Sequence, residues 1–104
     1  AMDAAGVSYG VDGDVIIVSF DSNKPAVQHV LDGNMNATFE CNPMAAPFVD
    51  EVIKQLEAGE TPEKEIYMEE SWFAAEDLVT EITVNGETMP IIQVTQEVLD
   101  ARPY

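Results

Sequence analysis

The first half of the chain alternates between apolar runs and polar turns in a way that predicts a strand, a helix and a second strand. Residues 15–20 form an almost unbroken apolar run rich in β-branched side chains, which is typical of a strand covered by helices on both faces. Apolar residues then recur at helical spacing over 26–31, with Pro25 suited to the first turn and Gly33 to a left-handed cap. A second strand is predicted over 37–41. We therefore expect a βαβ unit in a mainly parallel sheet.

From residue 45 onward the apolar spacing becomes helical, and it gives the clearest helix of the chain. One face is apolar and the opposite face is charged, as expected for a helix that packs on one side. Gly59 ends this helix, and Pro62 keeps it from resuming. The alternation over 64–69 then predicts a strand at a sheet margin. The apolar positions of the helix are Ala45, Val49, Val52, Ile53 and Leu56.

The last part of the chain carries the signals of a β-hairpin and a short final helix. Asn85-Gly86 is a strong two-residue turn signal, and apolar residues flank it over 81–94. Thr95 can cap the final helix. With 104 residues and no visible domain boundary, the chain is predicted to be a single α/β unit. Its expected architecture is a three-layer fragment of a doubly wound, mainly parallel sheet with a C-terminal β-hairpin.

Composition narrows the possible partners and the expected extent of the chain. Twenty acidic against four basic residues give a net charge of −16, which would repel nucleic acid and anionic membrane surfaces. The single cysteine, Cys41, excludes an internal disulfide and a site built from several thiolates. Residues 1–6 read as the last turn of a helix ended by a glycine cap. We therefore expect the chain to be a fragment of a longer protein.

Candidate chemistry is expected where the two predicted strands end. Ligands in open α/β sheets bind beyond the carboxyl ends of strands, so Asp21 and the pair Cys41-Asn42 stand at the expected positions. The only histidine, His29, falls in the predicted helix, away from the strand ends, and is expected to be a surface residue. Alternation places Glu40 on the opposite face of its strand from Cys41, which argues against a catalytic carboxylate pair with Asp21. We expect no enzyme activity.

No metal or cofactor site is predicted either. The acidic stretch 32–36 resembles the start of a calcium loop, but Ala37 and Pro43 stand where such a loop needs glycine and glutamate. The chain also lacks a glycine-rich phosphate loop. Trp72 could offer a sugar-stacking platform, but an aromatic residue beside an apolar segment is expected to pack against the body of the domain.

Several stretches of the chain resemble, in order and spacing, the C-terminal part of the type I periplasmic sugar-binding proteins. Those proteins carry a hydrophobic strand ending in Gly-Phe-Asp, a helix ending in Asp-Gly, a strand leading to Gln-Asn-Pro, and a long helix ending in Gly-Lys. The similarity covers about the first 70 residues. The matching motifs here are Phe20-Asp21, Asp32-Gly33, Cys41-Asn42-Pro43 and Gly59.

The resemblance implies a two-lobed receptor that closes on a sugar or related polyol and delivers it to the permease of an ABC transporter. It places the protein outside the cytoplasm, in the periplasm or as a cell-surface lipoprotein. The position of Asp21 accepts hydrogen bonds from sugar hydroxyls in that family, whereas the position of Cys41 is commonly a polar amide. The candidate ligand-binding residues are Asp21, Asn23, Cys41 and Asn42. The alternative is the ligand-sensing domain of a sugar-responsive transcriptional repressor, which shares the same scaffold.

The resemblance also predicts how this chain should behave alone. Residues 1–104 would be the C-terminal fragment of a two-lobed domain. Because the family's chain crosses between lobes just after the strand over 37–41, this fragment would contain part of each lobe. Only one wall of the cleft would then be present, so the fragment should bind sugar weakly or not at all. A truncated sheet leaves an apolar edge unpaired, so we expect a homodimer or swapped assembly.

Overall fold

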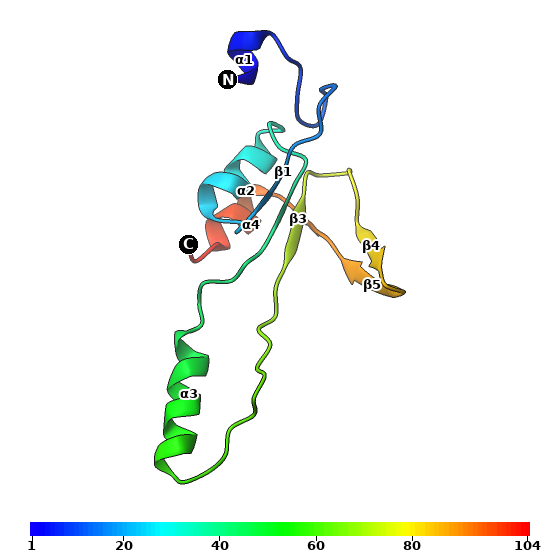
Figure 1. Ribbon diagram of the computed structural model, residues 1–104. Coiled ribbons are helices and arrows are strands. Elements are labelled where there is room, and N and C mark those ends of the chain that lie inside the picture. Colours follow the sequence, from blue (N-terminus) through cyan, green and yellow to red (C-terminus); the bar gives the residue numbers. More distant parts are fainter.

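The structure, a computed structural model, describes residues 1–104 and has an α/β fold built on a four-stranded sheet in the order β1-β2-β3-β6 (Figure 1). The β1–β2 and β3–β6 pairs are parallel, and the β2–β3 pair is antiparallel. The predicted βαβ unit is confirmed: β1, α2 and β2 follow one another, and β1 and β2 run parallel. The sheet strands are β1 (Val18–Phe20), β2 (Ala37–Phe39), β3 (Trp72–Ala74) and β6 (Ile92–Gln93).

Local hydrogen bonds define the two helices that pack on this sheet. The helix α2 (Lys24–Leu31) begins where the Asn23 side chain accepts a hydrogen bond from the backbone N–H of Ala26 at 3.0 Å. It ends before Gly33, whose φ of +74° matches the predicted left-handed position. The helix α4 (Gln96–Ala101) begins at Thr95, whose hydroxyl oxygen accepts from the N–H of Val98 at 3.3 Å.

The hydrophobic core lies between these helices and one face of the sheet. Strand alternation and register put Phe73, Ala75 and Val94 on the same face. Side chains from both helices meet them there, and each member of the cluster is at most 8% exposed. The six core residues are Val27, Val30, Phe73, Ala75, Val94 and Leu99.

No helix packs on the opposite face of the sheet, which is open over β1, so the expectation of helices on both faces was wrong. Val18 is 53% exposed and Phe20 is 71% exposed, whereas a strand between two helical layers would bury both. The named strand begins only at Val18. Before it, Val15 bridges to Tyr9, and Ile17 exchanges hydrogen bonds with Asn36, whose side chain accepts from the N–H of Ile17. An unbroken apolar run looks the same in a strand that helices cover on both faces and in a strand with one face uncovered.

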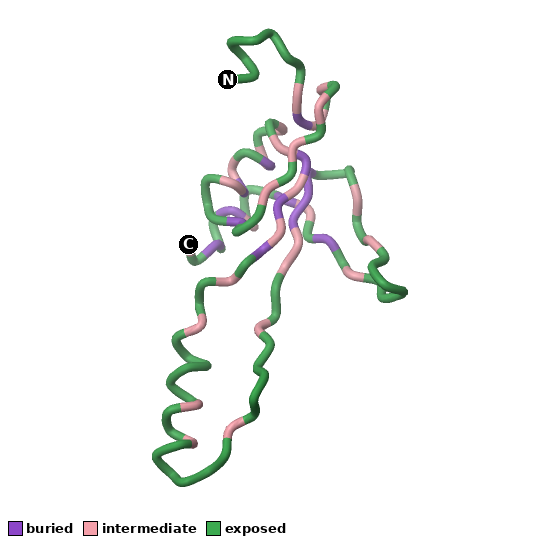
Figure 2. The backbone as a smooth tube through the Cα atoms, viewed as in Figure 1, coloured by how far each residue is buried: buried purple, intermediate pink, exposed green.

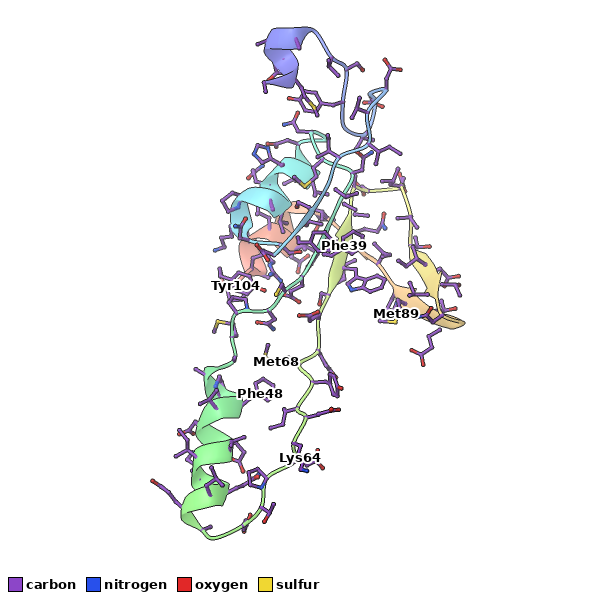
Figure 3. All side chains as sticks on the ribbon, viewed as in Figure 1. Phe39, Phe48, Lys64, Met68, Met89 and Tyr104 are labelled. Atoms are coloured by element: carbon purple, nitrogen blue, oxygen red, sulfur yellow. The ribbon has the colours of Figure 1, made fainter.

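A long arm projects from the sheet and carries the helix α3 (Ala46–Glu57) (Figure 1). Gly59, with a φ of +77°, follows the end of the helix as predicted. The returning segment 59–71 contains no strand, so the strand expected over 64–69 was wrong. No residue of α3 is buried, and Figure 2 shows the arm as almost entirely exposed. Phe48 and Met68 face each other across the arm (Figure 3) and line an apolar groove.

The predicted hairpin consists of β4 (Glu81–Val84) and β5 (Glu87–Pro90). Asn85 and Gly86 both have positive φ, 53° and 87°, as a tight two-residue turn between strands requires. The hairpin is shorter than the expected range 81–94, because residues 92–93 leave it and join the main sheet.

At the other end of the chain, α1 (Met2–Ala5) is a single helical turn ended by Gly6, as predicted. None of the helices has the length and apolar character that crossing a bilayer would require.

Candidate functional site

A row of three aromatic side chains crosses the open face of the sheet. Phe20, Phe39 and Trp72 are in register on β1, β2 and β3, so their side chains point the same way. The ring centroids of Phe20 and Phe39 are 5.8 Å apart, and those of Phe39 and Trp72 are 5.5 Å apart in an edge-to-face contact. The row lies at the carboxyl ends of the parallel strands β1 and β2, where α/β sheets bind ligands.

An open hollow of about 380 Å³ adjoins this row. Its lining combines three aromatic residues with two glutamates and Cys41. The hollow lies where the chain leaves the sheet after β2 and returns to it before β3. The lining residues are Phe20, Phe39, Glu40, Cys41, Glu70 and Trp72.

The turn after β1 holds Asp21 in an unusual backbone conformation. Asp21 and Ser22 have φ values of +80° and +45°, which non-glycine residues rarely adopt and which recur at functional sites. Ser22 is fully buried and shares a 3.2 Å hydrogen bond with the hydroxyl of Thr38. Thr38 in turn accepts from the Ser19 hydroxyl at 2.8 Å. This chain of hydroxyls anchors the turn and leaves Asp21 exposed at the strand end.

The four candidate ligand-binding residues are placed differently. Cys41 is exposed and lines the hollow, and Asp21 directly follows Phe20, another lining residue. The side-chain oxygens of the two asparagines form local hydrogen bonds. The Asn23 side chain caps α2, and the Asn42 side chain accepts a hydrogen bond from the N–H of Met44 at 2.9 Å. Each asparagine therefore retains its side-chain NH₂ group as the donor that could face a ligand.

Sequence reasoning missed the cluster around Glu40. Its carboxylate accepts hydrogen bonds from the guanidinium of Arg102 at 2.8 Å, the hydroxyl of Tyr104 at 2.6 Å and the N–H of Ser71 at 2.8 Å. The Glu40 and Arg102 side chains are 6% and 9% exposed. One signal was present: a glutamate on the covered face of a strand needs a cation, and Arg102 is the only arginine.

Glu40 should make the stability of the fold sensitive to acid. Burial acts to raise the pKa of Glu40, but hydrogen bonds from Tyr104, Arg102 and Ser71 outweigh it and hold the pKa below the ordinary 4.5. A lowered folded-state pKa contributes stability above the unfolded pKa, and that contribution is lost as the pH falls through the folded-state value. Urea denaturation between pH 7 and pH 3 should therefore show this loss.

Glu40→Gln provides the control for that series, because the other acidic residues also titrate in this range. The difference in unfolding free energy between the parent and Glu40→Gln should be largest at pH 7 and shrink as the pH falls below 4.5. A difference that stays constant with pH would show that Glu40 does not act through its charge.

Comparisons with known proteins show that the chain is similar to a curated protein and to a solved structure. No protein-family model matches the chain. The chain is 35% identical over 75 residues, 72% of its length, to the fructose import binding protein FruE of Bifidobacterium longum (strain NCC 2705). A crystal structure from Mycobacterium smegmatis superimposes with a TM-score of 0.59 and 31% sequence identity over 71% of the chain. The chain spans only 22% of the first protein and 24% of the second.

Proposed function

We propose that this chain forms one wall of the ligand cleft of an extracytoplasmic sugar-binding receptor for ABC-type import. The similarity to a fructose import binding protein supports this class of function. The observation on which this proposal depends most is the exposed Asp21. It is held in a strained turn beside an aromatic row at the carboxyl ends of parallel strands. An ionised carboxylate accepts strong hydrogen bonds from sugar hydroxyls, and aromatic faces cover the apolar face of a sugar ring.

The open faces of the molecule support the proposal that residues 1–104 are the C-terminal fragment of a two-lobed domain. The aromatic row has no helix over it, and α3, on the arm of a molecule 61 Å long, buries none of its residues and leaves an open apolar groove against the returning segment. Two segments, 40–45 and 68–71, connect this arm to the sheet. In the proposed receptor, α3 belongs to the second lobe, and these two segments cross between the lobes beside the hollow.

Calorimetric titration of the complete receptor with pentoses and hexoses, including fructose, tests this function. We expect at least one of these sugars to bind with a micromolar or lower Kd, and the isolated chain 1–104 to bind it about 100-fold more weakly or not at all. Failure of every sugar in the panel would contradict the proposed function. Micromolar binding by the isolated chain would contradict the one-wall arrangement.

The isolated chain should associate with itself at high concentration. The outer edge of β1 is unpaired in the sheet order, and Ile16 and Phe20 beside it are 74% and 71% exposed. Light scattering should give the mass of a homodimer, more readily at high salt because the charge of −16 repels like chains. Val18→Lys at the edge should weaken this dimer, whereas Val84→Lys on the hairpin should not. A strictly monomeric mass of the parent chain at high concentration would contradict the predicted self-association.

A further inference from the structure

Residues 102–104 form hydrogen bonds beside two parts of the candidate site. One is the turn after β1, and the other is the segment that follows β2. The backbone N–H of Lys24 donates to the carbonyl of Tyr104 at 2.8 Å, which ties the tail to the start of α2, three residues after Asp21. The hydroxyl of Tyr104 and the guanidinium of Arg102 both donate to one oxygen of Glu40, the residue before Cys41. Figure 3 shows Tyr104 beside the point where the chain leaves the sheet for the arm.

Glu40 extends this connection to the returning segment. Its second carboxylate oxygen accepts from the N–H of Ser71, and its own N–H donates to the carbonyl of Ser71 at 3.0 Å. Ser71 precedes Trp72, the last aromatic residue of the row. The tail therefore reaches the Asp21 turn on one side and the Cys41 and Trp72 wall on the other.

The Arg102 side chain is buried and is held by more than its ion pair with Glu40. Its guanidinium carbon lies 4.9 Å from the centroid of the Phe73 ring and 4.6 Å from that of Tyr104, so the cation is enclosed between two aromatic faces. Phe73 belongs to the core, which anchors this arrangement to the body of the fold. A buried cation held in this way by one carboxylate and two rings fixes geometry as well as charge, although its Nε has no hydrogen-bond partner.

We infer that the tail 102–104 is a positioning device that sets the spacing between the Asp21 turn and the hollow, and thereby the affinity for ligand. Arg102 and Tyr104 lie on the covered face of the sheet, so they act through Glu40 and are not themselves ligand contacts. The effect on affinity rests on the proposed function, whereas the effect on the geometry of the hollow does not.

Tyr104→Phe is the most selective test, because it removes one hydroxyl and keeps the ring beside Arg102. Trp72 is the only tryptophan of the chain and lines the hollow, so its fluorescence reports the geometry directly. In Tyr104→Phe we expect Trp72 emission to shift to longer wavelength and its quenching by acrylamide to rise. Tyr67→Phe is the matched control, since the exposed Tyr67 hydroxyl donates to Glu65 at 2.9 Å on the arm. The control should leave Trp72 emission unchanged.

If the tail 102–104 only stabilised the fold, any substitution that destabilises the fold to the same extent would change Trp72 fluorescence equally. Val98→Ala weakens the packing of α4, the helix before the tail, against the core, and it removes none of the hydrogen bonds to the Glu40 side chain. Equal changes in Trp72 fluorescence in Val98→Ala and Tyr104→Phe, or none in Tyr104→Phe, would overturn the inference. In the complete receptor, Tyr104→Phe should raise the Kd for sugar about tenfold, with Tyr67→Phe unchanged. If the complete receptor binds no sugar, the proposed function fails, while the Trp72 comparison still decides the positioning role.

Discussion

Arg102→Ala is expected to lower the free energy of unfolding by about 3 to 5 kcal/mol. The substitution leaves the Glu40 carboxylate buried without its cation, and it removes the guanidinium from between the Phe73 and Tyr104 rings. Such a loss is a large share of the roughly 5 to 15 kcal/mol by which small domains are stable. Urea denaturation at pH 7, followed by far-UV circular dichroism, measures it.

Lys54→Ala is the matched control for that loss, because it also breaks an ion pair. Lys54 and Asp50 lie 2.6 Å apart on α3, but their side chains are 64% and 63% exposed. Water and salt screen such a pair, so the expected loss is below about 0.5 kcal/mol. Similar losses in the two variants would show that burial of the Glu40 and Arg102 pair does not increase its contribution to the free energy of unfolding.

Asp21→Asn should weaken sugar binding by the complete receptor by about 100-fold. The amide keeps the size of the side chain but replaces a charged acceptor of two or more hydroxyl hydrogen bonds with a neutral group. The turn is anchored by Ser22, which is buried against Thr38, so the substitution should leave the fold intact. Isothermal titration calorimetry gives the change in Kd, and thermal unfolding checks stability.

Asp14→Asn makes the same chemical change at an exposed residue in the turn before β1, away from the hollow. Its sugar affinity should equal that of the parent. Wild-type affinity in Asp21→Asn would remove Asp21 from the binding site, and equal losses in both variants would indicate a general effect of charge.

The elements that the sequence predicts well are those fixed by local chemistry. The Asn23 cap and Pro25 specify the start of α2, and the Asn85-Gly86 turn specifies the hairpin, because each acts within a few residues. The open face of the sheet was not predictable in this way. The apolar run over 15–20 looks the same whether its second face is covered by a helix of the same chain or by nothing.

The candidate site shows the same division. Asp21 and Cys41 were predicted to lie at the carboxyl ends of neighbouring strands, because each follows an apolar run, and the structure places them there. Pairing of Glu40 with Arg102 joins residues 62 positions apart, so no local pattern reveals it. The aromatic row depends on the register of three strands, and Trp72, expected to pack in the body of the domain, lies partly exposed beside Phe39.

Hydrogen exchange of the complete receptor with and without its sugar tests the central claim most directly. If the end of the sheet is one wall of the cleft, sugar should slow amide exchange in 20–23, 39–42 and 70–72, while exchange in the hairpin 81–90 stays the same. A sugar that binds the receptor but leaves those three segments unprotected would contradict the account.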